Sequence, residues 1–162
     1  MRIHLKIYSG NIIIPFNHQH LLVGTIHKWL GWNDLHGNVA LFSFSRIEKG
    51  KPLKDGLQLE KYSSMFISAF DNEVIKLLIN GIQKDKTMFN DLSVSEIVIQ
   101  EDPDLSDRDS FYTGSPILIK RPVGEKTKHF LYNDKQSNEL LKETLITKMK
   151  HLGIEDDSLE IY

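Results

Sequence analysis

The order of strand and helix patterns over the first hundred residues constrains the fold more than any other feature of this chain. Alternating apolar and polar residues predict a half-buried strand over 3–7, and apolar runs predict further strands over 39–46, 63–70 and 94–100. Helical spacing of apolar residues lies between the first and second strands and between the third and fourth. The resulting order, strand, helix, strand, strand, helix, strand, is typical of the ferredoxin-like (βαββαβ) fold. We expect an α+β protein whose antiparallel sheet is covered on one face by two helices.

Each predicted helix follows a residue that can cap its N-terminus. Asn17 precedes a helix that runs to about Leu30, and Asp71 precedes one that runs through Ile82. The apolar stripes expected to face the sheet consist of Leu22, Val23, Ile26 and Leu30 in the first helix and Val74, Leu77, Leu78 and Ile82 in the second.

The last third of the chain carries a shorter series of elements. Residues 103–114 begin with an acidic stretch and are predicted to form a linker, after which two strand patterns and an amphipathic helix over 134–152 follow. Strand, strand and helix do not make a self-sufficient fold, so these residues either complete the first sheet or begin a second domain. We favour a ferredoxin-like domain over 1–102 and the start of a second ferredoxin-like unit over 115–162.

The composition of the 162 residues excludes several classes of protein. There is no cysteine, and therefore no disulfide framework, thiolate nucleophile or cysteine-based zinc site. The formal net charge of −2 provides no global basic field, although it leaves room for a local basic patch. No apolar run approaches the roughly 18 residues of a membrane span, and the N-terminus lacks the apolar core of a signal peptide. We expect a cytoplasmic protein without a membrane partner.

Histidines early in the chain are the candidates for chemistry. His20 and His27 are seven residues apart, so a helix would place them within about 20° of the same direction. His36 lies in a predicted loop before an aromatic strand, and loops held by rigid elements often carry function. Imidazole suits proton transfer near neutral pH. Two alternatives stay open: surface histidines without a role, and a zinc site that includes His18, for which no established carboxylate ligand exists.

Basic residues gather at two places. The predicted central hairpin carries Arg46, Lys49, Lys51, Lys54 and Lys61, and a later strand ends with Lys120 and Arg121. Lysine and arginine at such positions can pair with the phosphates of a nucleic acid. A solvated charged hairpin is the alternative.

Five short motifs follow one another along the chain and carry a family resemblance. They are Ile14-Pro15-Phe16-Asn17-His18-Gln19, the helix with Gly24 and Ile26-His27, Leu35-His36, Leu41-Phe42-Ser43-Phe44-Ser45, and Ser115-Pro116-Ile117. Their order and spacing resemble those of the CRISPR-associated repeat-processing endoribonucleases of the RAMP superfamily. That superfamily is built from ferredoxin-like folds.

The resemblance implies a metal-independent endoribonuclease that cleaves CRISPR repeat RNA and needs no cofactor. In such enzymes the ribose 2′-OH attacks the adjacent phosphate and leaves a 2′,3′-cyclic phosphate and a 5′-OH. His36 matches the family's loop histidine and His27 matches a helix tyrosine or histidine. They are implied as general base and general acid, with the two roles exchangeable.

The expected partners follow from the same resemblance. CRISPR repeat RNA is the expected ligand, and other CRISPR-associated proteins and a second copy of the chain are further candidates. The residues expected to bind RNA are Arg46, Lys49, Lys51, Lys120 and Arg121.

Two departures from the family pattern keep other interpretations open. Ala40 occupies about the position of a lysine found in some members, and no glycine-rich loop of the family's type occurs before Tyr162. We therefore expect a fragment or a divergent short member. The alternatives are a non-catalytic RNA-binding RAMP subunit and an unrelated ferredoxin-like protein with surface histidines.

Overall fold

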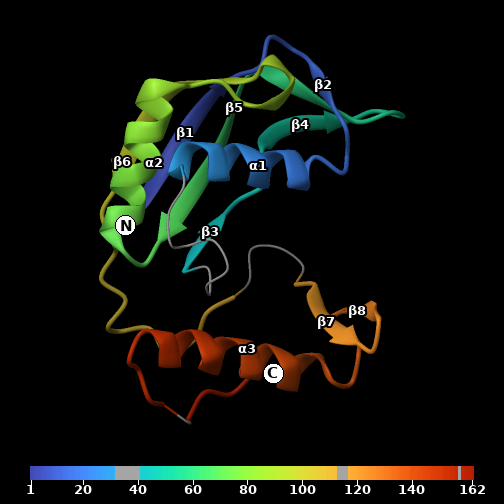
Figure 1. Ribbon diagram of the computed structural model, residues 1–162, viewed down its shortest axis with the longest axis vertical. Coiled ribbons are helices and arrows are strands. Elements are labelled where there is room, and N and C mark those ends of the chain that lie inside the picture. The colour runs from blue at the N-terminus through green and yellow to red at the C-terminus, as the bar shows by residue number, and fades with distance from the viewer. Residues whose placement is uncertain (32–40, 113–116, 157) are drawn as a thin grey trace. The chain divides into compact units, whose positions relative to one another are not determined.

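The computed structural model describes all residues except 32–40, 113–116 and 157. The described residues fall into two units, Met1–Pro103 and Asp104–Tyr162, whose elements are labelled in Figure 1.

The first unit is built on an antiparallel sheet. Its elements are β1 (Arg2–Tyr8), β2 (Ile13–Ile14), α1 (Gln19–Leu30), β3 (Phe42–Phe44), β4 (Glu48–Pro52), β5 (Leu57–Ala69), α2 (Asn72–Lys84), the 3-10 turn η1 (Phe89–Asp91) and β6 (Ser93–Gln100). Among the described residues the sheet has six strands. Four of them follow the order β2-β5-β1-β6, and the other two, β3 and β4, each pair with β5. The short strands β3 and β4 together occupy the place of the second strand of a βαββαβ fold. The predicted ferredoxin-like fold class is confirmed.

The core lies between this sheet and the two helices. Ile3, Leu5 and Ile7 of β1 are fully buried, as the period-2 alternation predicted. The side chains opposite the first two are Ile67 and Met65 of β5, which are also buried. Both helices cover this face of the sheet (Figure 1), and full burial of each aliphatic side chain contributes about 1.5–3 kcal/mol.

The two helix starts differ in how well the sequence predicted them. Asp71 caps α2 as expected, because its carboxylate accepts a hydrogen bond from the backbone N of Glu73 at 2.8 Å. The predicted Asn17 cap is wrong: α1 begins at Gln19, its N-cap residue is His18, and no side chain caps it. The turn before α1 is instead closed by the backbone, with the N of His18 donating to Pro15 O at 3.2 Å.

Both apolar stripes are rotated slightly from the prediction. Val23 is 39% exposed and Leu77 is 41% exposed, whereas Thr25 and Ile75 are buried in their places. Periodicity shows that a stripe exists but cannot show which of its edges meets the neighbouring helix. The rest of each predicted stripe is buried as expected.

The second unit contains two strands and one helix within its described residues. They are β7 (Ile119–Val123), β8 (Lys126–Phe130) and α3 (Ser137–His151). β7 and β8 form an antiparallel pair. That this unit begins a second ferredoxin-like domain stays a prediction. Among the described helices of the chain, none has the length and apolar character needed to cross a membrane.

Candidate functional site

His27 lies in the last turn of α1, at the boundary between core and surface. It is half-buried and its Nδ1 is buried, while its neighbours Ile26 and Trp29 belong to the core. The carbonyl of His27 accepts a hydrogen bond from the backbone N of Gly31 at 3.0 Å, where the helix ends. The position of His27 is therefore set by the packing of α1.

The other two histidines of this region have local contacts. His18 is buried, its Nδ1 donates to Pro15 O at 2.8 Å, and its ring stacks on that of Phe89 with centroids 6.2 Å apart. His20 is exposed, and its Nδ1 donates to Asn17 O at 2.7 Å. Within the part of the chain that the structure describes, no three histidine, aspartate or glutamate side chains are grouped as metal ligands.

His36, the second predicted catalytic residue, lies outside the described residues. So does Ala40. The segment that contains them connects α1 to β3. The first described residue after it is Leu41, whose carbonyl accepts a hydrogen bond from Phe70 N at 3.1 Å. The pairing of His27 with His36 stays a prediction.

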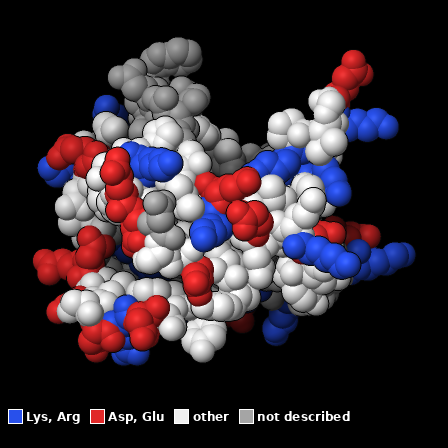
Figure 2. All heavy atoms as spheres, turned by 90° about the horizontal axis from the view of Figure 1, so that it is seen from below, with Lys and Arg blue, Asp and Glu red and all other residues white. Residues whose placement is uncertain are grey.

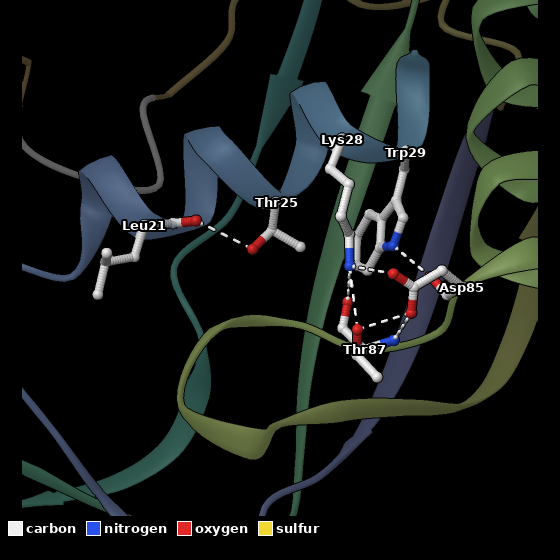
Figure 3. Close-up of polar contacts among 6 residues, drawn as sticks. All are labelled: Leu21, Thr25, Lys28, Trp29, Asp85 and Thr87. Carbon is white, nitrogen blue, oxygen red and sulfur yellow. Dashed lines mark hydrogen bonds and ion pairs between the residues drawn. The ribbon is translucent and has the colours of Figure 1, made fainter.

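A polar clamp joins the end of α1 to the segment that follows α2 (Figure 3). The Nζ of Lys28 donates to Oδ2 of Asp85 at 2.8 Å, to Thr87 O at 2.7 Å and to Thr87 Oγ1 at 3.1 Å. The other carboxylate oxygen, Oδ1, accepts from Thr87 N at 2.9 Å and from Thr87 Oγ1 at 2.6 Å. This clamp holds the helix turn that carries His27. The sequence reasoning missed it.

The same junction is closed by an unusually near approach of the two helices. Trp29 Nε1 donates to Asp85 O at 2.9 Å, and Gly81 of α2 lies directly against the backbone of Trp29. A cavity of about 280 Å³ opens beside them, lined in part by Lys28, Lys84 and Asp85. The junction is therefore closely packed on the core side and polar toward solvent.

The hydrogen bonds from Lys28, and then those from Thr87, hold the pKa of Asp85 well below its ordinary value. A depressed carboxyl pKa stabilises the fold at any pH above the unfolded pKa of about 3.9, and the contribution is lost as the pH falls through and below that value. We therefore expect Asp85→Asn to lower the unfolding temperature at pH 7, and the difference from wild type to shrink at pH 3. Thermal unfolding followed by circular dichroism at both pH values measures this.

Asp55→Asn, in the exposed turn between β4 and β5, is the matched control and should leave the unfolding temperature unchanged at both pH values. An Asp85→Asn effect of equal size at pH 7 and pH 3 would contradict a role for the ionised carboxylate.

The basic residues predicted to bind RNA divide between the two units. Arg46, Lys49 and Lys51 are exposed in the first unit, on β4 and the segment that leads into it. Lys49 has a positive φ of 61°, at the irregularity in the β4–β5 pairing. All three side chains are exposed, and their role in binding RNA stays a prediction.

Lys120 and Arg121 lie on β7 in the second unit and have different surroundings. Lys120 is exposed, whereas Arg121 donates from Nη2 to Leu140 O at 2.8 Å and to Thr144 Oγ1 at 2.6 Å, both on α3. Arg121 thus ties the strand to the helix. Figure 2 shows acidic and basic side chains on the same face of the molecule, in keeping with the net charge of −2.

Comparison with known proteins adds information at the level of structure. No family model matches the sequence, and no curated protein matches it significantly. A solved structure described as a CRISPR associated protein Cas6 is similar, with a TM-score of 0.76 and 26% identity, over 99% of this chain and 74% of that one.

Two further solved structures share the fold. One comes from work on a Cas6-related gene from Pyrococcus furiosus, with a TM-score of 0.77 and 23% identity, over 97% of this chain and 73% of the other. The second is described as a RAMP protein binding different RNA substrates, with a TM-score of 0.74 and 22% identity, over 97% and 74% of the two chains. The similarity therefore extends through both units of the chain.

Proposed function

We propose that this chain belongs to the Cas6/RAMP family, and that it binds CRISPR repeat RNA and cleaves it. The observation that carries the proposal is the likeness to a Cas6 structure over 99% of the chain. A RAMP protein of the same fold is described as binding RNA, which supports an RNA ligand here as well. Such coverage favours this proposal over an unrelated ferredoxin-like protein.

The proposed reaction is an internal transesterification. A general base takes the proton of a ribose 2′-OH, the 2′-oxygen attacks the adjacent phosphorus, and the bond to the 5′-oxygen breaks. A general acid gives a proton to that leaving oxygen, so the products are a 2′,3′-cyclic phosphate and a 5′-OH. Histidine can take either role near neutral pH.

We assign the two proton-transfer roles to His36 and His27. His27 is suited to its role because α1 is held by the core on one side and by the clamp of Lys28, Asp85 and Thr87 on the other. A side chain carried by a fixed helix turn needs little ordering when the substrate binds. Arg46, Lys49 and Lys51 are proposed to hold the RNA backbone in the first unit, and Lys120 in the second.

The direct test uses labelled repeat RNA in the presence of EDTA. We expect cleavage in chelator, with a cyclic phosphate on the 5′ product, because two side chains perform both proton transfers. Mass spectrometry of the product identifies the cyclic phosphate.

Two results would overturn parts of this proposal. Cleavage that EDTA abolishes and Mg²⁺ restores would contradict the histidine mechanism. Tight binding without any cleavage would identify the chain as a non-catalytic RNA-binding RAMP subunit.

A further inference from the structure

The face of the sheet opposite the helices carries an unusual set of side chains on its two central strands. Residues that lie directly opposite each other in the ladder point to the same side, and this side alternates with the buried one. We call this set the open sheet face; it consists of Arg2, His4, Lys6 and Tyr8 on β1 and Tyr62, Ser64, Phe66 and Ser68 on β5.

Aromatic rings on this face form two cross-strand pairs. Tyr8 and Tyr62 meet edge to face with centroids 5.7 Å apart, and each is 42% exposed. His4 and Phe66 lie 5.9 Å apart, centroid to centroid, farther along the same strands. None of these four belongs to the buried core. The exposed surface of these rings can therefore be buried only when a ligand or a partner binds to this face of the sheet.

Cations lie over two of these four rings, those of Phe66 and Tyr62. The guanidinium carbon of Arg2 is 4.1 Å from the centroid of Phe66, and Arg2 Nε donates to Ser68 Oγ at 2.7 Å. The ammonium of Lys6 is 5.1 Å from the Tyr62 centroid, and that of Lys61 is 5.9 Å from it. Phe66 and Tyr62 are therefore each held next to a positive charge.

Carboxylates lie around this face. Glu60 is exposed on β5 itself, two residues before Tyr62, and two others lie on the neighbouring strands. Glu96 of β6 is 3.4 Å from Lys6, and Glu48 of β4 lies opposite Ser64. Where β1 and β5 lie directly opposite each other, the charged side chains of the open sheet face are Arg2 and Lys6. This central part of the face offers two cations to a phosphate, which would compete with Glu96 for Lys6.

Unpaired nucleotides have the two features that this surface would recognise. A base can stack on an aromatic ring or on an arginine guanidinium plane, and the phosphate that follows it can pair with a nearby cation. A base inside a duplex is already stacked on its neighbours and offers no free face to a sheet. The occupant should therefore be single-stranded.

We propose that the open sheet face is a stacking platform for an unpaired stretch of RNA, with Tyr62 and Tyr8 as the rings that receive bases. The identification of the ligand as RNA rests on the proposed function, but the platform does not use His27 or His36. It is a binding surface on the side of the sheet that the helices leave uncovered.

The test measures binding of a fluorescein-labelled 12-nucleotide oligouridylate to the full chain by fluorescence anisotropy at low salt. We expect Tyr62→Ala and Tyr8→Ala each to weaken binding by at least about fivefold, because base–aromatic stacking contributes substantially for each base. Tyr62→Phe keeps the ring and should bind like the wild type. Leu77→Ala changes an exposed apolar residue on α2 and is the control for a general surface effect.

A duplex RNA of the same length should bind more weakly than the single strand and should be insensitive to Tyr62→Ala. Unchanged affinity of Tyr62→Ala and Tyr8→Ala for the oligouridylate would overturn the platform. So would a change of oligomeric state in Tyr62→Ala, measured by sedimentation without RNA, because the face would then be an interface between copies.

Cleavage assays separate failure of the platform from failure of the proposed function. A wild-type chain that cleaves repeat RNA, together with a Tyr62→Ala variant of unchanged affinity, would remove the platform and leave the nuclease standing. A wild-type chain that binds the oligouridylate through Tyr62 but never cleaves repeat RNA would keep the platform and remove the nuclease proposal.

Discussion

Replacing His27 by alanine is expected to lower the rate of repeat-RNA cleavage by about 10²–10⁴-fold, the usual contribution of a positioned acid or base. The fold should survive, because His27 is half-buried at the edge of the core and its packing neighbours Ile26 and Trp29 remain. Single-turnover cleavage at saturating protein measures the chemical step, and anisotropy measures RNA affinity. We expect the rate to fall and the affinity to stay unchanged.

His36→Ala should have a similar effect, and the double variant separates a joint role from two independent ones. Groups that act in one step are not additive, so His27→Ala with His36→Ala should be no slower than the worse single variant. The rate of the wild type should also pass through a maximum between about pH 6 and pH 8, as it does when one imidazole is needed neutral and another protonated.

His20 provides the matched control on the same helix. It is exposed, and its Nδ1 donates to Asn17 O, so His20→Ala should leave the cleavage rate unchanged. An equal loss of rate in His20→Ala and His27→Ala would argue against a specific role for His27. Full activity of His27→Ala would remove that residue from the mechanism.

Gly81→Ala is expected to destabilise the protein by about 1–3 kcal/mol, the usual range for overpacking. A Cβ at this position would lie 2.0 Å from the carbonyl oxygen of Trp29 and 2.6 Å from its carbonyl carbon. These are backbone atoms of α1, so the helices would have to move apart. Urea unfolding followed by tryptophan fluorescence measures the change in the free energy of unfolding.

Gly24→Ala is the control, because Gly24 is exposed on α1 and a Cβ there would meet nothing within 4 Å. Alanine is favoured over glycine in a helix interior by up to about 1 kcal/mol, so this variant should be as stable as the wild type or more stable. If Gly81→Ala and Gly24→Ala change the free energy of unfolding by the same amount, the effect arises from helix propensity and not from the close approach of the two helices.

The order of the elements could be read from the sequence, because each depends on residues close together in the chain. The alternation through Ile3, Leu5 and Ile7 predicted β1, and the Asp71 cap predicted the start of α2. β5 was found only in part, since it begins at Leu57 and not at 63. Leu57 and Leu59 at its start are half-buried and buried, but the exposed charged pair Glu60-Lys61 follows them and interrupts the apolar pattern.

The candidate site was accessible to sequence reasoning only in part. His27 and the exposed Arg46, Lys49 and Lys51 could be proposed from residue type and position. The role of Arg121 could not, because its partners on α3 lie 19 and 23 residues away. Asp85-x-Thr87 after a helix is a local turn signal, but nothing in the sequence indicated that the turn binds Lys28.

Local periodicity was enough for the strand and helix order, for the buried side of β1 and for the histidines as candidates. The tertiary structure alone brought Lys28 to Asp85, 57 residues away, placed Gly81 against Trp29, and paired Tyr8 with Tyr62 across two strands. The physical reason is the range of the interactions. Periodicity and caps arise between residues a few positions apart, whereas these contacts depend on strand register and on how two helices pack together on one sheet.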